Sequence, residues 1–473
     1  MKRVLILVLC AALLATCAVN PVTGKKELSF YSEQGEIELG KETDKQVCGQ
    51  YGVYGDAALS VYVSGVGNRM VPYSHRPQLH YSFQVLDTSV VNAFAAPGGY
   101  VYITRGALAL INTESELAVI LGHELGHVAA RHTIRRMSEM ILIQVGLAVA
   151  GSISKTLAEI SGVASIGVQL LYLKFSRDDE NQADSLGVQY SRGAGYNPGQ
   201  MVNFFASLQR MGDMSGQSSL PGFLSTHPLN GERIQNITKM LTAADASLAV
   251  KRDAYLQSIN NIVYGNDPRQ GYVENNAFYH PGQRFVFEIP AGWKAQNTPS
   301  QVTLVSQDEQ AALVLGAEKS AEDLKTYAGR KATELQGGQL LGEQSLLLNG
   351  LSSYHRLYDL ARQDSSTLRV RLSFISKAGF IYTLAAVSTA STFGTYDTSF
   401  QKVLRSFKVL TDAAHINRAP RRLKLVRAGG GQTLQALFQA SGMPKDSWAN
   451  MALLNEMELK DVPKSGQWLK IIQ

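Results

Sequence analysis

Three histidines and a glutamate lie in the otherwise apolar segment LAVILGHELGHVAARH at residues 117–132. On a helix, His123 and His127 are one turn apart, so both imidazoles can face one metal ion. Zinc accepts neutral imidazole nitrogen, and its catalytic sites keep one position open for water. Glu124 projects about 100° round from His123, where it can take a proton from an activated water and pass it to a leaving amine. The alternative, two surface histidines, fits poorly with the apolar flanks.

A third protein ligand is expected in the segment FSRDDENQADSLGVQY at residues 175–190. Glu180 and Asp184 are four residues apart, so they share one face of a helix. We predict that Glu180 binds the metal. Asp184 is then placed to accept a hydrogen bond from the second nitrogen of a ligand histidine, which fixes the tautomer and orientation of that ring. Two solvated acids on a surface helix are the alternative.

The elements that position these residues are also visible in the pattern. YSFQVLD (81–87) and YVYITRG (100–106) have the alternation and the β-branched or aromatic residues of strands, and Pro97-Gly98-Gly99 breaks the chain before the second. A helix capped by Thr113 or Ser115 carries the histidines. Other helices are expected from near Ser32, through Asp184, and around residues 199–212 and 230–250.

The joint pattern resembles the bacterial metallopeptidases related to the CaaX prenyl proteases. The matching segments are GHELGH (122–127), SRxxExxAD (176–184), VNAFAAPGGYVYITRGAL (91–108), STHPLNGERI (225–234) and NPVTGKKEL (20–28). The resemblance covers residues 18–245. It implies a gluzincin fold with an active-site helix, a glutamate helix and a small sheet whose edge strand holds substrate, in a membrane-attached periplasmic endopeptidase.

Carried over residue by residue, the resemblance makes His123, His127 and Glu180 the ligands of one zinc ion per chain and Glu124 the general base and acid. Asp184 would not bind the zinc itself but would accept a hydrogen bond from a ligand histidine. The substrate edge strand would include Asn92, Ala93, Phe94, Gly98 and Gly99. An extended peptide can pair with such an edge, and the two glycines would let its backbone approach closely. Tyr100, Tyr102 and His132 are interpreted as packing or surface groups.

The resemblance also places His227 and Arg233 near the zinc, and it leaves two roles open. His227 could occupy the fourth zinc position and displace water, which would keep the enzyme closed until substrate moves the loop. Alternatively, His227 and Arg233 could stabilise the oxyanion of the tetrahedral intermediate. A loop histidine bonded only to backbone is the third interpretation, and we favour the gate.

The N-terminus has the pattern of a secretory signal peptide at residues 1–17, with two basic residues followed by an apolar stretch too short to span a bilayer. Its end, Leu14 to Cys17, resembles a bacterial lipobox, although Thr16 is unusual before the cysteine. We therefore predict a lipidated Cys17, with plain secretion as the alternative, and Ala18 favours the outer membrane. Cys48 has no partner for a disulfide and is interpreted as a small buried thiol.

Two further domains are predicted after the peptidase domain at 18–265. Within that domain, the apolar zone at 141–173 is interrupted by Lys155 and Glu159, which favours two buried helices over a membrane-dipping surface. Residues 280–412 predict an α+β accessory domain with an antiparallel sheet. A basic linker leads to residues 421–473, which resemble a LysM module and imply peptidoglycan contact, with simple packing on a neighbour as the alternative.

The chain has 473 residues and a mild net charge of +6, without a basic stripe interleaved with aromatics, so nucleic acid is not an expected partner. The fold expected overall is α+β, with a mainly helical zincin domain first. The predicted function is a zinc endopeptidase of the cell envelope that cleaves misfolded or stalled envelope proteins, with outer-membrane assembly machinery as a candidate partner. The alternatives are a chaperone-like assembly factor and a peptidoglycan-binding adaptor.

Overall fold

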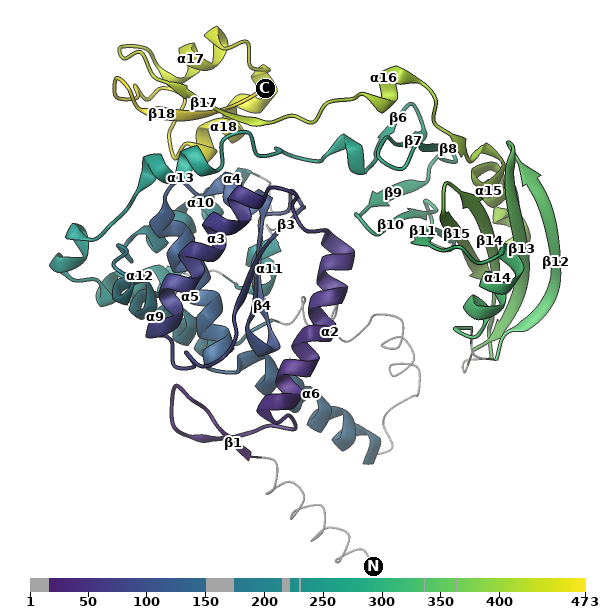
Figure 1. Ribbon diagram of the computed structural model, residues 1–473, viewed down its shortest axis with the longest axis horizontal. Helices are drawn as coiled ribbons and strands as arrows, with labels where there is room; N and C mark the ends of the chain where they lie inside the picture. Colours follow the sequence, from purple (N-terminus) through teal and green to yellow (C-terminus); the bar gives the residue numbers. More distant parts are fainter. Residues whose placement is uncertain (1–16, 150–173, 215–221, 229–230, 336, 363–364) are drawn as a thin grey trace, which may run out of the picture. The chain divides into compact units, whose positions relative to one another are not determined.

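The computed structural model describes residues 17–149, 174–214, 222–228, 231–335, 337–362 and 365–473. The chain divides into two units, each with helices and sheets (Figure 1). The first unit comprises Met1–Cys48, Gly52–Asn266 and Arg421–Gln473, and the second comprises Gly49–Tyr51 and Asp267–Pro420. The α+β class is therefore confirmed. The predicted signal segment up to residue 16 and most of the apolar zone at 141–173 lie outside the described residues.

The helices before residue 266 begin where the sequence offers caps. Ser32 accepts from the backbone N–H of Gly35, and Thr113 from that of Glu116, as predicted. These helices are α2 (Glu33–Tyr51), α3 (Ala57–Met70), α4 (Arg105–Leu110), α5 (Glu114–Ala129), α6 (His132–Val149), α9 (Arg177–Gly193), α10 (Gln200–Met214), α11 (Gly222–Thr226), α12 (Gly231–Met240) and α13 (Arg252–Ser258). The helix expected over 230–250 was predicted too long. It ends at Met240 because Thr242 and Asp245 form a new capping box.

Helices α5 and α9 pack against each other through glycines. A Cβ atom on Gly187 would lie 3.0 Å from the backbone nitrogen of His123, and one on Gly126 would lie 3.1 Å from the Cβ of Leu186. A Cβ on Gly122 would lie 3.2 Å from the carbonyl oxygen of Gly187. Any larger residue would separate the two helices, so the small residues set the distance between the histidine-bearing helix and the glutamate-bearing helix.

A small sheet lies beside α5 in the strand order β3-β5-β4 (Figure 1). Strand β5 (Tyr100–Thr104) runs parallel to β3 (Ser82–Leu86) and antiparallel to β4 (Ala93–Ala96). The sheet therefore has β4 at its edge. A short hairpin of β1 (Cys17–Val19) and β2 (Lys26–Leu28) precedes α2.

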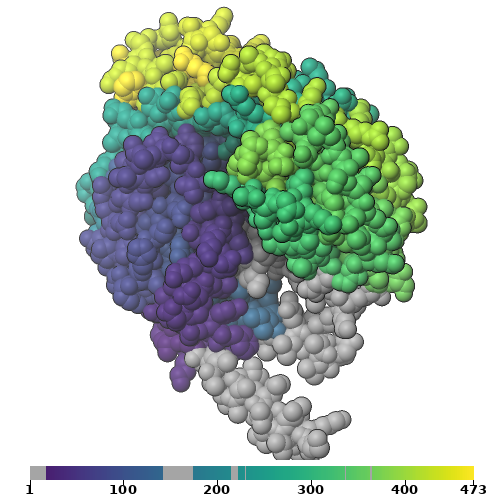
Figure 2. All heavy atoms as spheres, turned by 45° about the vertical axis from the view of Figure 1, so that its right-hand side comes forward, coloured from purple at the N-terminus to yellow at the C-terminus, as the bar shows by residue number. Residues whose placement is uncertain are grey.

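The C-terminal residues of the first unit form a module of two strands and two helices. They are β17 (Leu423–Arg427), α17 (Leu434–Ala440), α18 (Trp448–Leu454) and β18 (Trp468–Ile472), and β17 pairs antiparallel with β18. Figure 2 shows this module, coloured yellow, against the teal segment of the same unit. The backbone N–H of Asn261 donates to the carbonyl of Leu423 at 2.8 Å, which ties the two together.

A buried lysine strengthens this contact. Lys470 is fully buried, and its Nζ donates to the carbonyl oxygens of Ala109, Leu110, Ile111 and Leu454 at 2.7–3.2 Å. Three of these carbonyls belong to the C-terminal end of α4, where the helix leaves acceptors without intrahelical donors. Burial lowers the pKa of Lys470 to about 7. The module thus completes the hydrogen bonding of a helix that leads into α5.

The second unit contains two antiparallel sheets. The larger has the order β12-β13-β14-β15-β11-β10-β9, and the smaller has the order β16-β8-β7-β6. The strands are β6 (Tyr272–Glu274), β7 (Ala277–His280), β8 (Phe285–Glu288), β9 (Lys294–Asn297), β10 (Gln301–Val305), β11 (Ala312–Lys319), β12 (Gln339–Leu348), β13 (Leu351–Ala361), β14 (Thr367–Lys377), β15 (Phe380–Thr389) and β16 (Lys408–Val409). The unit's helices are α14 (Leu324–Ala332), α15 (Phe393–Ser406) and α16 (Ala413–Ile416).

One ion pair fixes the C-terminal turn of α9 and yields a pH prediction. The guanidinium of Arg192 donates to both carboxylate oxygens of Asp245 at 2.7 and 2.9 Å, and this pairing lowers the pKa of Asp245 from 3.8 to about 2. A carboxyl with a lowered folded pKa stabilises the fold above its unfolded pKa, and that stability is lost as the pH falls through the folded value. We expect Asp245→Asn to lower the free energy of unfolding by about 1–2 kcal/mol at neutral pH.

The difference between wild type and Asp245→Asn should shrink as the pH falls from about 4 to about 2. Urea unfolding at several pH values measures it. Asp253→Asn, at an exposed position on α13, is the matched control and should change little. A loss that stays constant across the acid range would contradict the ion-pair origin.

Candidate metal centre

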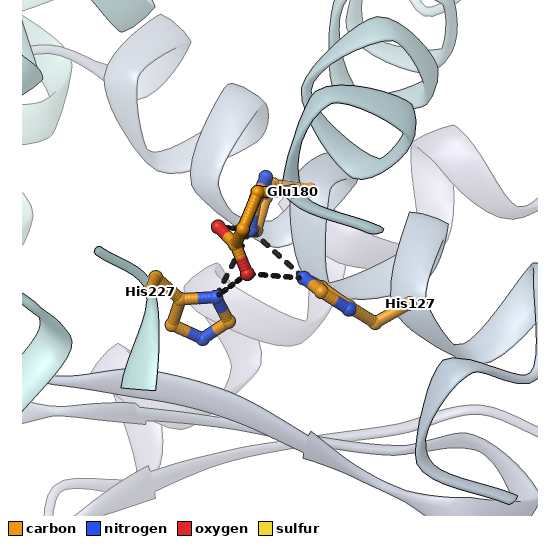
Figure 3. Close-up of side chains that lie close together, drawn as sticks. His127, Glu180 and His227 are labelled. Atoms are coloured by element: carbon orange, nitrogen blue, oxygen red, sulfur yellow. Dashed lines mark hydrogen bonds and ion pairs between the residues drawn. The ribbon is translucent and has the colours of Figure 1, made fainter. Parts of the chain in front are cut away.

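Four buried side chains converge in the first unit. One ligand atom from each of His123, His127, Glu180 and His227 lies within 4.8 Å of the others, and none of these residues is more than 2% exposed. His123 Nε2 is 3.1 Å from His127 Nε2 and 3.3 Å from His227 Nδ1. His227 Nδ1 is 2.9 Å from Glu180 Oε1 (Figure 3). The sequence predicted three of the four as ligands and placed His227 nearby.

The elements described above explain this convergence. His123 and His127 face the same way because they are one turn apart on α5, and Glu180 lies in the first turn of α9. The capping box of Ser176 with Asp179 fixes where α9 begins. His227 follows α11 directly, and its backbone N–H donates to the carbonyl of Phe223 at 2.8 Å. Three separate segments therefore supply the four side chains.

Hydrogen bonds behind the ligand histidines set their orientation. His123 Nδ1 lies 2.9 Å from Asp184 Oδ1, and His127 Nδ1 lies 2.9 Å from His132 Nδ1. His132 Nε2 is 2.8 Å from Gln182 Oε1, which can only accept, so the network assigns the proton of His132 to Nε2. His132 Nδ1 then accepts from His127. Both ligand rings carry their proton on Nδ1 and turn the Nε2 lone pair inward, as metal binding requires.

Arg233 joins the carboxylates of the site. Its guanidinium donates to both oxygens of Asp184 at 2.7 Å, lies 2.8 Å from Glu180 Oε2, and donates to the carbonyl of Pro228 at 3.2 Å. Burial alone would raise the pKa of Asp184, but the hydrogen bonds from Arg233 lower it below its usual value. Burial likewise opposes ionisation of Glu180, whose pKa is lowered by His227, His123 and Arg233.

These contacts engage Nε and both terminal nitrogens of Arg233 with the protein itself. The sequence had assigned Arg233, with His227, as a candidate oxyanion donor. In the structure its guanidinium is directed at Glu180 and Asp184, and the oxyanion role stays a prediction. A bidentate arginine–carboxylate pair of this kind fixes geometry as well as charge.

Glu124 is the buried carboxylate of the site that lacks a hydrogen-bond partner among the described residues. It is 1% exposed, and neither carboxylate oxygen makes a hydrogen bond within the described part of the chain. His227 Nε2 is 3.6 Å from Glu124 Oε1. Burial raises the pKa of Glu124, while the pKa of His127 is lowered by burial and by His123. A neutral imidazole and a carboxylate with a raised pKa are the forms that metal binding and proton transfer use.

The predicted edge strand lies beside these residues. Strand β4 packs against α5, and Asn92 pairs with Thr104 through a backbone N–H to carbonyl bond of 3.0 Å. In an antiparallel ladder the next residues point their backbone groups the other way, so those of Ala93 and Ala95 face the free edge. Phe94 is buried and contacts the ring of Tyr102.

Gly98 and Gly99 lie very close to other backbone atoms of the chain. Both are buried and have positive φ values, 76° and 101°. A Cβ atom would lie 2.9 Å from the Cα of Ile37 at Gly98 and 2.3 Å from the carbonyl oxygen of His80 at Gly99. The glycines therefore make room for the chain's own backbone, and their close approach to a substrate backbone stays a prediction.

Sequence reasoning missed three residues of the site. His132, interpreted as a packing or surface group, is fully buried and orients His127. Phe175 packs on the ring of His127 with centroids 4.1 Å apart, and Phe223 stacks on His227 at 4.7 Å. The position of His132, five residues after His127, was the available signal. The two phenylalanines carried none, because their role depends on contacts between segments.

The chain is similar to known metallopeptidases over this region. Residues 58–241 match the family model Peptidase family M48, a range that includes every predicted site residue except Cys17. The "Beta-barrel assembly-enhancing protease" of Yersinia pestis is 31% identical over 225 residues, which cover 46% of this chain and 46% of that protein.

Two further relatives carry related names. The "Mitochondrial metalloendopeptidase OMA1" of Schizosaccharomyces pombe is 28% identical, covering 49% of this chain and 68% of that protein. The "Metalloprotease LoiP" of Escherichia coli (strain K12) is 29% identical, covering 34% and 63%. The chain spans about half the length of the beta-barrel assembly-enhancing proteases it matches.

Proposed function

We propose that the protein is a zinc-dependent endopeptidase of the cell envelope, on the basis that residues 58–241 match the model of peptidase family M48. One observation carries the proposal. Two imidazole nitrogens and a carboxylate converge in a buried site, directly beside a second carboxylate, that of Glu124, which has no hydrogen-bond partner among the described residues.

The donor set fits zinc. His123, His127 and Glu180 offer two neutral nitrogens and one oxygen, the ligand types of catalytic zinc sites with a fourth position left open. Asp184 and His132 hold the two imidazoles with Nε2 inward. When bound, zinc supplies Lewis-acid polarisation of the scissile carbonyl and lowers the pKa of a water molecule.

The chain's own residues then handle the proton and the peptide. Glu124 accepts a proton at a carboxylate oxygen during attack and returns it to the leaving amine, a role that suits its raised pKa. The free backbone groups of Ala93 and Ala95 pair with an extended substrate and bring its scissile bond beside α5. An unfolded or stalled polypeptide presents such an extended segment, which is why we assign misfolded envelope proteins as substrates.

The location and partners follow from the N-terminus and from the relatives. We propose a periplasmic enzyme anchored to the outer membrane by acylated Cys17. Within the described residues, no helix has the length and apolar character to cross a membrane. The name of the Yersinia pestis relative favours contact with outer-membrane assembly machinery, and it also supports the rival proposal of an assembly factor with minor proteolysis. The C-terminal module is proposed to contact peptidoglycan.

Glu124→Gln separates the enzyme from the assembly factor. The amide keeps the size of the side chain but cannot accept the proton, so cleavage of unfolded casein should fall by a factor of about 10²–10⁴. Zinc content, measured by elemental analysis, should stay unchanged. Glu38→Gln on α2, whose carboxylate is exposed, is the matched control and should retain full activity. Casein cleavage that survives in Glu124→Gln would refute the proposed mechanism.

The geometry around His227 supports the gate. Its Nδ1 is one of the four clustered ligand atoms, and its ring is held by the ring of Phe223. Phe223 in turn donates its backbone N–H to the carbonyl of Val91 at 2.9 Å, on the segment that leads into β4. This contact between Phe223 and the Val91 segment requires glycine at position 222, because a Cβ atom there would lie 2.7 Å from Val90 Cγ1.

This arrangement gives substrate a way to open the gate. The carbonyl of Val91 faces the same free edge as those of Ala93 and Ala95, so a peptide pairing along the edge competes with Phe223 for it. Displacing Phe223 removes the ring that holds His227. We therefore propose that substrate pairing releases His227 from the site and frees the fourth position.

His227→Ala tests the gate against the oxyanion role. Losing a gate should raise basal casein cleavage by up to about tenfold, the factor expected if about one molecule in ten is open at rest. Losing an oxyanion donor should instead lower turnover roughly a hundredfold or more. Initial rates at equal zinc content measure the effect, with exposed His80→Ala as the control. A hundredfold loss would overturn the gate.

A further inference from the structure

A pocket of about 510 Å³ lies within the first unit, between the C-terminal module, α4 and α10. Helix α18 forms one wall and packs against both of these helices. Ser89 and Val91, which precede β4, form part of the opposite wall. The volume falls within the range of about 300–1,000 Å³ that is typical of ligand pockets. The metal centre's side chains are not among the described residues that line it.

The lining combines apolar walls with polar groups that have spare hydrogen-bonding capacity. Arg421 and Asn450 are exposed, and neither side chain makes a hydrogen bond or ion pair within the described part of the chain. Their donors and acceptors are therefore available to a ligand. The apolar lining comes from both the peptidase domain and the module, and it includes Val91, Met211, Val263, Leu453, Leu454 and Ile472.

The charges around the pocket balance each other. Arg105 lines the pocket but pairs with Asp87 at 2.7 Å. The positive charge of Arg421 is matched by the negative charge of Asp446, which lines the same pocket and accepts a hydrogen bond from the hydroxyl of Ser447 at 3.3 Å. A pocket without excess charge favours a ligand without net charge. Apolar side chains on a polar but uncharged main chain meet this description.

Val91 connects the pocket to the edge of the small sheet. Its neighbour Asn92 donates its backbone N–H to Thr104 Oγ1 at 3.1 Å and accepts the N–H of Thr104 at 3.0 Å. The backbone groups of Val91 therefore point to the other, free side. The carbonyl of Val91 accepts from Phe223, whereas its N–H has no hydrogen-bond partner among the described residues. A peptide carbonyl can accept from that N–H.

Helix α10 shows that the pocket and the free edge are on the same side of the sheet. Met211 of α10 lines the pocket. Phe204, on the same helix, contacts Phe223 with ring centroids 5.3 Å apart. Phe223 is the residue that bonds the free edge at Val91. A chain that runs along β4 and past Val91 therefore enters the pocket.

We propose that this pocket is a distal subsite of the peptidase, which holds an apolar segment of the polypeptide substrate beyond the part that pairs with β4. The C-terminal module supplies its outer wall and so takes part in substrate binding. The inference rests on the proposed function and narrows its substrate class. The preferred substrates are extended polypeptides with an apolar segment at a distance from the scissile bond, in place of short peptides.

Peptide binding to full-length, detergent-solubilised Glu124→Gln protein tests the subsite without cleavage. One fluorescein-labelled peptide has about five residues, which matches β4, and the other has about twelve residues, which reaches past Val91. The longer peptide carries leucine and phenylalanine toward both ends. Fluorescence anisotropy should show that the longer peptide binds at least about tenfold more tightly, because its apolar side chains enter the pocket.

Asn450→Trp, made in the same background, fills the pocket from α18. It should weaken binding of the longer peptide by about tenfold and leave the shorter peptide unchanged. Ala449→Trp is the matched control, because Ala449 is the exposed neighbour on the same helix and does not line the pocket. With Glu124 intact, Asn450→Trp should raise the KM for casein and leave kcat unchanged. The thermal unfolding midpoint should stay the same, since Asn450 is exposed.

Equal affinity for the two peptides would overturn the proposal, and so would an Asn450→Trp variant that binds the longer peptide as tightly as its parent. Displacement of the longer peptide by soluble peptidoglycan fragments would assign the pocket to a glycan and overturn it as well. Failure of the proposed function is distinguishable from these results. It would appear as a wild type that does not cleave casein, whereas peptide binding to Glu124→Gln does not depend on cleavage.

Discussion

The distance between helices α5 and α9 is the constraint on which the site depends. Three glycines at their contact, Gly122, Gly126 and Gly187, let the two backbones approach until a Cβ would meet a neighbour at 3.0–3.2 Å. That approach brings Glu180 within reach of His123 and His127. The same contact explains why this apolar segment has a glycine directly before each of the two motif histidines, His123 and His127.

Burying so many ionisable groups costs free energy, and the ion pairs of Arg233 offset much of that cost. Two carboxylates, those of Glu180 and Asp184, share its guanidinium at 2.7–2.8 Å. An isolated buried charge is costly, and a charge with a geometrically matched partner is much less so. Glu124 makes no hydrogen bond to Arg233, and burial raises its pKa. The three carboxylates therefore differ: the pKa values of Glu180 and Asp184 are lowered, whereas that of Glu124 is raised.

The parts of this arrangement that follow from local spacing could be predicted from the sequence. The one-turn spacing places His123 and His127 together, and Thr113 and Ser32 cap helices as expected. The parts that depend on contacts between distant segments could not. No spacing indicates that Lys470 completes the end of α4, or that Gly99 avoids the carbonyl of His80.

His132 and Arg233 illustrate the same limit in the site. Their partners lie on other helices, so the spacing of the sequence could not indicate which side chains they contact. The overlong helix predicted over 230–250 has a local cause instead. The sequence has a capping box, Thr242 with Asp245, which begins a separate helical turn after Met240.

The central claim, that His123, His127 and Glu180 form a zinc site, is tested most directly by elemental analysis of protein purified without chelators. Wild type should hold close to one zinc per chain, and His123→Ala should hold far less, because removing one of three protein ligands leaves too few to retain the ion. Wild-type protein with less than about half an equivalent of zinc, or His123→Ala with as much as wild type, would contradict the account.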